Sequence, residues 1–333
     1  MKSNLRTVGF RPGERNVFFH ILTACNLSCR HCYINQEQHG SNMLSGKTVE
    51  TWLKLFVEPG KESNVIFLGG EPTMHPDLAH LVKVAKKLGY CVTVDSNGYL
   101  FHDFLIRTSP ADLDFLSFSL DGPDRETNDR IRGDGVFATC VTNIGKAVEK
   151  GFNVSLIYTV SRKNIDQLYG MIPLLSSLRV KKFFIQVIGL RGRSQVERDA
   201  DSLQVSREQW LKIVPDAAAR IAEHGIHVTY PKVFLEDNEK FECAGNVAEN
   251  FFVFPNGRVY QCPLCEDYPV HSYVIRNDRL EKNRGLTEDR FFQLDIAEGC
   301  VMNRLLQPDT IEYNQKGKAA FKISCCLLKQ EIL

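Results

Sequence analysis

Residues 17–32 read VFFHILTACNLSCRHC, a short apolar run followed closely by three cysteines. The run Val17–Leu22 is rich in aromatic and branched aliphatic residues and predicts a β-strand. Cys25, Cys29 and Cys32 fall in the loop behind it, at a spacing of C-x3-C-x2-C. Three soft thiolates within eight residues can converge on one metal ion or one iron–sulfur cluster. The first strand therefore leads into a candidate metal site.

Outward from this stretch, short β-rich runs alternate with amphipathic helical patterns as far as residue 225. The six predicted strands are Val17–Leu22, Asn64–Leu68, Cys91–Val94, Asp114–Leu120, Asn153–Val160 and Lys182–Ile188. Helices are predicted over Gly46–Val57, Asp77–Leu88, His102–Thr108, Val136–Lys150, Ile165–Ser177 and Arg207–Glu223. Because the strands are mostly apolar on both faces, the alternation predicts right-handed crossovers and a parallel sheet covered by helices, an α/β fold.

The composition is that of an ordinary globular chain, with 43% hydrophobic and 24% charged residues and a formal net charge of +1. This balance argues against a protein whose main task is to neutralise a phosphate backbone or an anionic membrane surface, so we expect no nucleic-acid or membrane partner. The basic residues near the sixth strand, Arg191–Arg193 and Lys181–Lys182, are interpreted as solvated loop.

The cysteine content is unusual, with eleven in 333 residues. The chain shows no signal peptide and no run of about 18 apolar residues that would span a membrane. We therefore expect a cytoplasmic protein. In that reducing compartment, many cysteines indicate metal binding or catalysis rather than disulfides.

Residues 226–333 differ in texture from the rest of the chain. They carry six of the eleven cysteines and one clear hairpin, Phe251–Phe254 with Arg258–Gln261, which turns through Pro255–Asn256–Gly257. A length of 333 residues also suggests two domains, at about 150 residues each. We predict one domain over 1–225 and a small cysteine-rich α+β domain over 226–333, with the boundary within 226–242.

The segment Cys25–Cys32 resembles the C-x3-C-x-Φ-C signature of the radical S-adenosylmethionine (SAM) superfamily, with His31 in the aromatic position. The segment Gly69-Gly70-Glu71-Pro72 matches the GGEP segment of that family. The resemblance spans about residues 15–225 and implies a partial (β/α)6 TIM-like barrel. It implies a [4Fe–4S] cluster on the three cysteines, whose open iron chelates SAM. Reductive cleavage then yields methionine and a 5′-deoxyadenosyl radical that abstracts a substrate hydrogen.

The GGEP segment also has a physical interpretation. Glycines let the main chain approach a ligand closely, and a carboxylate at the carboxyl end of a strand can pair with a cation in the site. By resemblance, the backbone of this segment and Glu71 receive the ammonium group of SAM. A small zinc knuckle, with His31 as its fourth ligand, is the alternative for the amino-terminal cysteines.

Further candidates follow the later strands, because loops at the carboxyl ends of strands build the active sites of α/β barrels. By resemblance, Ser119 and Asp121 face the ribose or the tail of SAM, and Ile188 and Gly189 face the adenine. Asn97 is expected to approach the cofactor. Ordinary turn chemistry is the structural alternative for each of these residues, since Asp-Gly and Asn-Gly pairs are common turn formers.

The late cysteines bracket the predicted hairpin. The pattern Cys243-x13-Gly257-x4-Cys262 resembles the opening of the SPASM/twitch extension, in which such cysteines hold an auxiliary [4Fe–4S] cluster. Six thiols complete one four-cysteine cluster, whereas two clusters need seven or eight, so we expect one. The predicted ligands are Cys243, Cys262, Cys265 and one of the vicinal pair Cys325–Cys326, here Cys325, with Cys300 as the alternative. A zinc ribbon at Cys262 and Cys265 remains a competing interpretation.

These features predict a radical SAM enzyme with two possible substrate classes. It modifies a peptide or protein residue, or it carries out radical oxidation or rearrangement of a small molecule. The non-enzyme alternative is an iron–sulfur protein that only transfers electrons. Only 24 residues precede Cys25, so we expect no fused leader-peptide-binding domain. A reducing partner such as flavodoxin or ferredoxin is implied. A spare thiol, Cys300 or one of the vicinal pair, would be placed to return a hydrogen atom.

Overall fold

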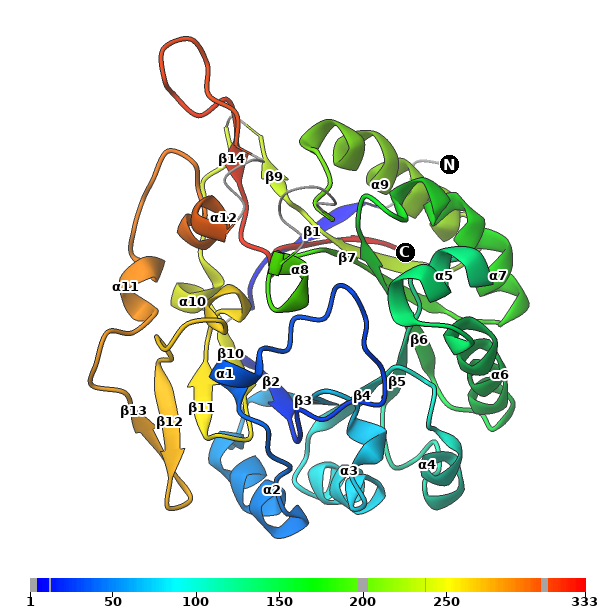
Figure 1. Cartoon of the computed structure of the whole chain (residues 1–333). Helices are drawn as coiled ribbons and strands as arrows, with labels where there is room; N and C mark the ends of the chain where they lie inside the picture. The colour runs from blue at the N-terminus through cyan, green and yellow to red at the C-terminus, as the bar shows by residue number, and fades with distance from the viewer. Residues whose placement is uncertain (1–4, 12, 197–202, 237, 307–310) are drawn as a thin grey trace.

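The computed structural model describes residues 5–11, 13–196, 203–236, 238–306 and 311–333. One 13-stranded sheet dominates it and curves around the loop that follows strand β2 (Figure 1). A separate two-stranded sheet pairs β9 (Phe234–Leu235) with β14 (Lys322–Ile323). The carboxyl ends of the central strands therefore face one shared region.

The six predicted strands are confirmed as six consecutive, parallel neighbours in this sheet. They are β2 (Glu14–His20), β3 (Glu62–Leu68), β4 (Cys91–Ser96), β5 (Phe115–Ser119), β6 (Val154–Val160) and β7 (Lys182–Val187). The register places Phe19 of β2 beside Phe67 of β3 and Val65 of β3 beside Val92 of β4, and all four side chains are fully buried. Burial of these aliphatic and aromatic side chains explains the apolar runs from which the strands were predicted.

Two further strands extend the parallel part of the sheet. β8 (His227–Pro231) pairs with β7, and β10 (Glu249–Val253) pairs with β2. The sheet therefore continues without a break from 1–225 into 226–333. The predicted hairpin is confirmed, because β10 pairs antiparallel with β11 (Arg258–Tyr260). The outer strands, also antiparallel, are β1 (Arg6–Val8), β12 (Tyr273–Arg276), β13 (Arg279–Lys282) and β15 (Lys329–Ile332).

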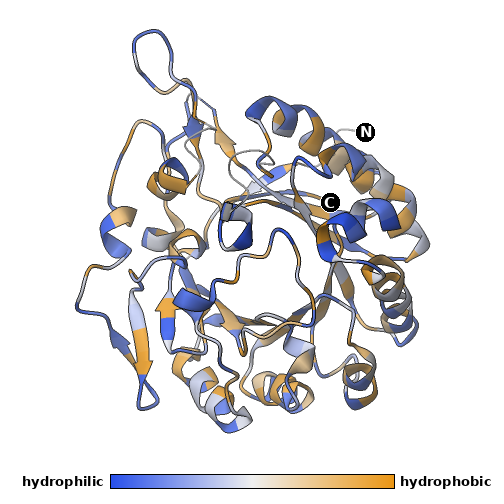
Figure 2. Ribbon diagram, viewed as in Figure 1, coloured by the Kyte–Doolittle hydropathy of each residue, from blue (hydrophilic) through white to orange (hydrophobic). Residues whose placement is uncertain are grey.

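Helices cover the outer side of the curved sheet, and their apolar sides contribute to the core (Figures 1 and 2). The predicted helices appear as α2 (Gly46–Leu53), α3 (Leu78–Lys87), α4 (His102–Arg107), α6 (Val136–Glu149), α7 (Met171–Ser177) and α9 (Arg207–Ala222). The other helices are α1 (Gln36–His39), α5 (Arg125–Arg132), α8 (Arg193–Val196), α10 (Ala244–Val247), α11 (Asp289–Phe292) and α12 (Val301–Leu306). Single 3-10 turns are η1 (Lys54–Phe56), η2 (Pro72–Met74), η3 (Ile165–Gly170) and η4 (Pro263–Cys265).

Local chemistry explains where several helices begin. The hydroxyl of Ser45 accepts the Thr48 amide at the start of α2, and the Asp124 carboxylate accepts the Thr127 amide at the start of α5. Ser206 forms a capping box with Gln209 ahead of α9. In the part of the chain that the structure covers, no helix has the length and apolar character needed to cross a bilayer.

Candidate functional site

The loop after β2 carries the amino-terminal cysteines over the carboxyl ends of the parallel strands. Cys25 reaches the surface, while Cys29 and Cys32 are half-buried. The Cys25 sulfur accepts the Leu27 amide at 3.4 Å, and the Asn97 side-chain amide lies 3.7 Å from the same sulfur. The surrounding protein displaces water from Cys25 and raises its pKa to about 11. Metal binding at neutral pH would therefore release a proton from this thiol.

The Gly69–Gly70 pair lies directly against the start of the cysteine loop. The Gly70 amide donates to the Leu22 carbonyl at 3.0 Å, and the Glu71 amide donates to the Ala24 carbonyl at 2.9 Å. A Cβ atom on Gly70 would overlap the Ala24 carbonyl oxygen, and one on Gly69 would overlap that of Leu22. Both positions therefore require glycine so that the two backbones can meet.

Glu71 is buried beside this contact and is fully engaged. One carboxylate oxygen accepts the amide and hydroxyl of Thr73 and the Ser96 hydroxyl, and the other accepts the Asn97 amide at 2.7 Å. Burial raises the pKa of Glu71 despite these hydrogen bonds. Glu71 thereby fixes the end of β4, and the Asn97 side chain, 2.9 Å from the Asn26 side-chain oxygen, reaches the cysteine loop. Contact between Glu71 and the SAM ammonium stays a prediction.

His31, Asp121 and Arg132 form a buried charged cluster under the same loop. The Asp121 carboxylate lies 3.0 Å from His31 Nε2 and 2.7 Å from Arg132 Nε, and its other oxygen accepts the Thr159 amide. Burial opposes ionisation of Asp121, but Arg132 and His31 outweigh it and hold its pKa below the usual range. The Arg30 amide also donates to the Ile131 carbonyl, so the carboxyl-terminal end of α5 holds this loop.

This arrangement disfavours the zinc-knuckle interpretation. His31 would have to be the fourth ligand through Nδ1, because its Nε2 atom lies beside the Asp121 carboxylate. Across the described ranges, no three His, Cys, Asp or Glu side chains are close enough to share a single metal ion. A four-iron cluster is larger than one ion and accepts thiolates that are farther apart. The three-thiol loop therefore fits a cluster better than a zinc ion.

The remaining predicted residues lie at the expected strand ends. Pro72 opens η2 directly behind Glu71, and Ser119 is the last residue of β5. Ile188 is buried and its amide donates to the Val160 carbonyl, which joins the ends of β6 and β7. Gly189 follows and its carbonyl accepts the Ser194 hydroxyl. The contacts of these residues with SAM stay predictions.

Sequence reasoning missed a buried polar network beside the cysteine loop. Arg191, interpreted as solvated, has a side chain that is only 15% exposed and lies 2.8 Å from the Glu266 carboxylate. Its guanidinium also lies over the ring of Tyr33, whose hydroxyl is 2.8 Å from His20 Nε2. The interpretation of Arg191 was wrong because long-range pairing decides its burial. The position of Tyr33 directly behind Cys32 was the available signal.

The late cysteines gather in one place. A pocket in the cysteine-rich region is lined by Cys243, Cys262, Cys300, Cys325 and Cys326 together with Phe241, Leu264, Phe291, Phe292, Val301 and Met302. Burial raises the pKa of Cys300 to about 12, whereas the hydrogen bond that Cys326 and Cys325 share lowers the pKa of Cys325. Cys265, a predicted ligand, is buried but does not line this pocket. Both members of the vicinal pair do line it.

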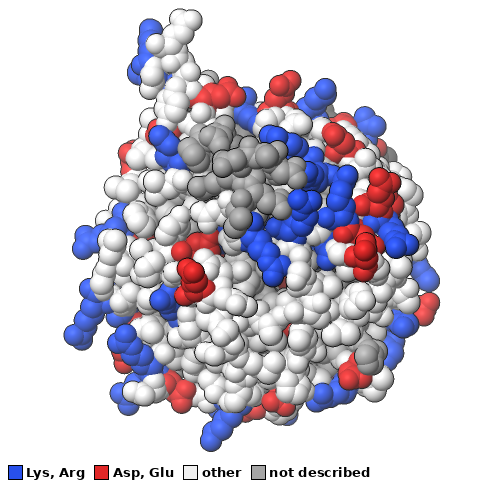
Figure 3. All heavy atoms as spheres, viewed as in Figure 1, with Lys and Arg blue, Asp and Glu red and all other residues white. Residues whose placement is uncertain are grey.

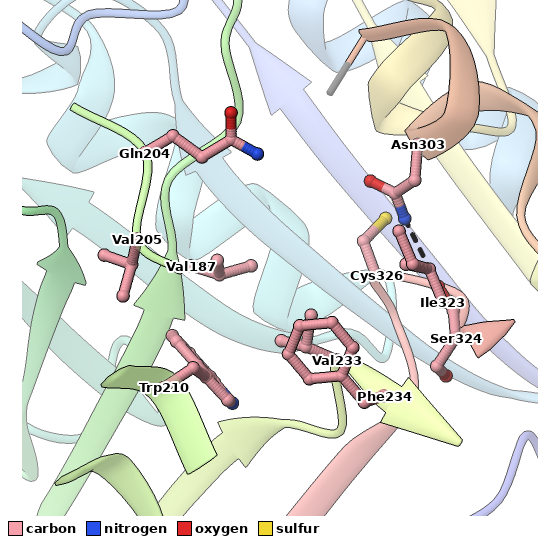
Figure 4. Close-up of a pocket in the computed structure, with 10 residues that line it drawn as sticks. All are labelled: Val187, Gln204, Val205, Trp210, Val233, Phe234, Asn303, Ile323, Ser324 and Cys326. Atoms are coloured by element: carbon pink, nitrogen blue, oxygen red, sulfur yellow. Dashed lines mark hydrogen bonds between the residues drawn. The ribbon is translucent and has the colours of Figure 1, made fainter. Parts of the chain in front are cut away.

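A second pocket shares one of these cysteines. It lies between the end of β7, α9 and β9 on one side and β14 on the other (Figure 4). Val187, Trp210 and Phe234 provide apolar walls, and the Cys326 sulfur and the Asn303 amide face it from the cysteine-rich region. Cys326 therefore lies between the cysteine pocket and this apolar pocket.

Basic side chains gather on the face over the strand ends (Figure 3). Arg193 donates to the Cys29 carbonyl, and Arg130 donates to the Lys163 carbonyl at 2.8 Å. Arg130, Arg162 and Arg193 are exposed. These residues are called the basic face below, and they place positive charge beside the cysteine loop although the whole chain is nearly neutral.

A comparison with known protein families matches the part of the chain that contains the cysteine loop and the Gly69–Gly70 segment. Residues 20–174 match the family model of the Radical SAM superfamily. This segment is a radical SAM domain. It contains Cys25, Cys29, Cys32 and the GGEP segment, and it ends within α7. The predicted resemblance is confirmed for this part of the chain.

Named relatives of the radical SAM domain are enzymes. The chain is 30% identical over 217 residues to Fe-coproporphyrin III synthase of Methanosarcina barkeri, covering 63% of this chain and 53% of the relative. It is 31% identical over 163 residues to a "Probable GTP 3′,8-cyclase" of Saccharolobus islandicus, covering 48% and 53%. The chain thus spans about half the length of these curated relatives. The domain and the names of these relatives support an enzyme.

A solved structure shares the fold over most of the chain. Streptococcus suis SuiB, bound to its precursor peptide SuiA, superposes with a TM-score of 0.62 at 14% identity. The superposition covers 90% of this chain and 65% of SuiB. The chain therefore shares its α/β architecture and large parallel sheet with SuiB.

Proposed function

We propose that the protein is a radical SAM enzyme that abstracts a hydrogen atom from a peptide or protein residue. The observation that carries this proposal is the contact between the cysteine loop and the Gly69–Gly70 segment at the carboxyl ends of β2 and β3. A pure electron carrier has no use for a site that receives the SAM ammonium, which is the role that the family resemblance gives to the GGEP segment. Catalysis with SAM explains why both are present.

The residues of the loop fit the cofactors. Three thiols supply soft ligands and leave one iron of a [4Fe–4S] cluster open for SAM. When bound, the cluster and SAM would supply the one-electron reductive cleavage of SAM that begins hydrogen abstraction. Within the described residues, the Asn26 side-chain nitrogen and His31 Nδ1 are buried without a hydrogen-bond partner. These atoms are free to contact a ligand beside the cysteines.

We also propose that the late cysteines hold one auxiliary [4Fe–4S] cluster. Cys243 and Cys262 line the pocket as expected, and so do Cys300 and the vicinal pair, which together offer more than the four thiols a cluster needs. Two cysteines are candidates for the third ligand: Cys265, whose thiol is hydrogen-bonded to that of Cys262, and Cys300, which lines the pocket. Cys325 is the proposed fourth ligand. The spare thiol Cys326 faces the apolar pocket of Figure 4.

The substrate class has two candidates. SuiB, which shares the fold over most of the chain, holds a precursor peptide, and this similarity supports a peptide substrate. The alternative is a small molecule, which the names of the curated relatives favour, since one is a coproporphyrin synthase and another a GTP cyclase. The reducing partner is proposed to be a small acidic electron carrier such as flavodoxin or ferredoxin, because the basic face adjoins the cysteine loop.

The proposal is tested by incubating anaerobically reconstituted protein with SAM and dithionite and measuring 5′-deoxyadenosine. We expect a time-dependent yield that Cys29→Ala abolishes and Cys91→Ala retains, because Cys91 is the first residue of β4 and lies at the end of that strand opposite the loop. Absence of 5′-deoxyadenosine above the Cys29→Ala background refutes the enzyme proposal. Adding a candidate peptide or a coproporphyrin with deuterium at its reactive carbon then separates the two substrate classes by label transfer.

Metal content tests the auxiliary cluster. We expect about eight irons per chain, falling to about four in Cys243→Ala and Cys262→Ala. Of Cys265→Ala and Cys300→Ala, the variant that loses the same four irons identifies the third ligand. About four irons in the unmodified protein, or one zinc in place of the second set, would contradict the auxiliary cluster.

A further inference from the structure

The loop between β7 and α8 lies between the Cys25–Cys32 loop and the Cys262–Cys265 segment. On one side the Arg193 amide donates to the Cys32 carbonyl at 2.9 Å. On the other side the Gly192 amide donates to the Asp267 carboxylate at 3.1 Å. A Cβ atom on Gly192 would overlap the carbonyl of Cys32 and that of Tyr33, so the loop and the cysteine segment are in backbone contact. This loop therefore touches both the amino-terminal cysteines and the segment behind Cys265.

Arg191 contacts the segments on both sides of this loop. Its Nη1 atom lies 2.8 Å from the Glu266 carboxylate, which is only 2% exposed, and it also donates to the Pro263 carbonyl. Its guanidinium lies over the Tyr33 ring, with 5.1 Å between the Arg191 Cζ atom and the ring centroid. One cation thus holds residues that directly follow Cys32, Cys262 and Cys265.

A second set of buried contacts closes a ring around the same interface. The Val253 carbonyl accepts a hydrogen bond from His20 Nδ1, so Nε2 of this ring accepts from the Tyr33 hydroxyl. His39 Nε2 donates to the Glu266 carbonyl at 3.2 Å. The rings of His20 and His39 both stack on the ring of Phe254, each with 4.0 Å between the ring centroids. The Arg191 bridge is therefore part of a continuous buried network.

We propose that Arg191 is a positioning residue that fixes the Cys25–Cys32 loop relative to the Cys262–Cys265 segment. The two-cluster reading of these sites rests on the proposed function, whereas the mechanical link between the two segments rests on the contacts alone. The parallel strands hold the amino-terminal loop on one side, and Arg191 links it to the cysteine-rich region on the other. This side chain therefore helps to set the separation and orientation of the two sites.

An arginine is required for this task. Its planar fork reaches Glu266 and Pro263 while its face covers Tyr33, and a lysine ammonium supplies only a point charge. Removal of the cation leaves the Glu266 carboxylate buried without its partner, which weakens the contact on the side of the late cysteines. Lysine is therefore expected to restore the Glu266 contact but not the stacking on Tyr33.

The test uses amide hydrogen exchange on the whole cluster-free protein. Arg191→Met should speed exchange about tenfold or more at the amides of residues 30, 32, 192 and 193, and in residues 262–268. Arg191→Lys should have a smaller effect, confined to residues 30–33. The matched control is Arg220→Met, because Arg220 also pairs with a carboxylate, Asp216, and lies over a tyrosine ring, Tyr169, but on the exposed side of α9. The control should leave both segments unchanged.

A reconstituted sample supplies a readout that general loosening would not move. The midpoint potential of the amino-terminal cluster should shift in Arg191→Met, return toward the original value in Arg191→Lys, and stay constant in Arg220→Met. Should Arg191→Met fail to fold, Glu266→Gln and Arg191→Lys carry the same test. Unchanged exchange in both segments of a folded Arg191→Met variant overturns the proposal. If the protein binds no iron, the proposed function fails while the exchange result still decides the role of Arg191.

Discussion

His39 illustrates how burial fixes the chemistry of single residues near the site. Its ring is buried, its Nδ1 accepts the Asn35 amide, and its Nε2 donates to Glu266, so the neutral form satisfies both nitrogens. Burial lowers its pKa to about 3. His20, on the other side of Phe254, also has a pKa well below its usual value because it is buried. Both imidazoles therefore stay neutral in the folded protein.

This neutrality predicts an acid-sensitive contribution to stability. An unfolded histidine binds a proton below about pH 6.5, whereas folded His39 binds one only near pH 3. Its contribution is therefore complete above pH 6.5 and is lost as the pH falls. Between pH 7 and 4.5, the unfolding free energy should fall by about 2 to 3 kcal/mol more in the original protein than in His39→Gln.

Urea unfolding of both proteins at several pH values measures this difference. The comparison is needed because burial raises the pKa of Asp95 and of Glu288 to about 7, and these carboxyl groups favour folding as the pH falls toward 4. Their contribution is the same in both proteins and cancels. Parallel pH profiles for the two proteins would show that His39 does not contribute.

Among single residues, those whose side-chain chemistry limits them to few roles could be predicted from the sequence as site residues. Cys25, Cys29 and Cys32 could be singled out because soft thiolates at close spacing have few other uses in a reducing compartment. Arg191 could not, because its burial depends on Glu266, 75 residues away. The position of Cys300 at the cysteine pocket was likewise decided by packing between segments distant in sequence.

At the scale of elements, the strand-to-loop junctions define the site. The Gly69–Gly70 segment meets residues 22–24 of the cysteine loop through two backbone hydrogen bonds, and Glu71 ties this contact to the end of β4. Three neighbouring strand ends are thereby held together. The six parallel strands were predicted because their apolar runs are long and their helices amphipathic. β8 was missed, since its residues, 227–231, lie in the segment taken as the domain boundary.

Gly70→Ala tests this junction. The added methyl group meets the Ala24 carbonyl, a backbone atom that cannot move aside, so we expect a loss of about 1 to 3 kcal/mol in the unfolding free energy. Iron content and 5′-deoxyadenosine yield should fall with it. The control is Gly145→Ala in α6, where a methyl group meets no atom within 4 Å. It should gain about 0.5 to 1 kcal/mol, because alanine is the better helix former. Equal stability of the two variants in urea would contradict the close approach.

For the whole molecule, the sheet joins both halves of the chain. β10 pairs with β2 on one side of the parallel run, and β15 pairs with β8 and β1 on the other. The sequence changes in character after residue 225, and all six late cysteines, from Cys243 onward, lie beyond that point. This change could not reveal that strands from this region extend the same sheet, because strand pairing across 200 residues leaves no local pattern.

The basic face makes a prediction at this scale. Charge reversal by Arg130→Glu with Arg162→Glu should slow reduction by an acidic protein donor about tenfold or more at low salt, with a smaller effect at high salt. Turnover with dithionite should not change. Lys316→Glu with Lys318→Glu, exposed in the loop before β14, is the control. Rates with the protein donor that are insensitive to both pairs of substitutions would exclude this docking face.

The central claim is that the Cys25–Cys32 loop holds a cluster that binds SAM. The most direct measurement is the electron paramagnetic resonance spectrum of the dithionite-reduced Cys243→Ala/Cys262→Ala variant, in which only the amino-terminal site can contribute a cluster signal. Addition of SAM should change the shape and position of this signal, and Cys29→Ala in the same background should remove it. A cluster signal that SAM leaves unchanged, or one that persists without Cys29, would contradict the account.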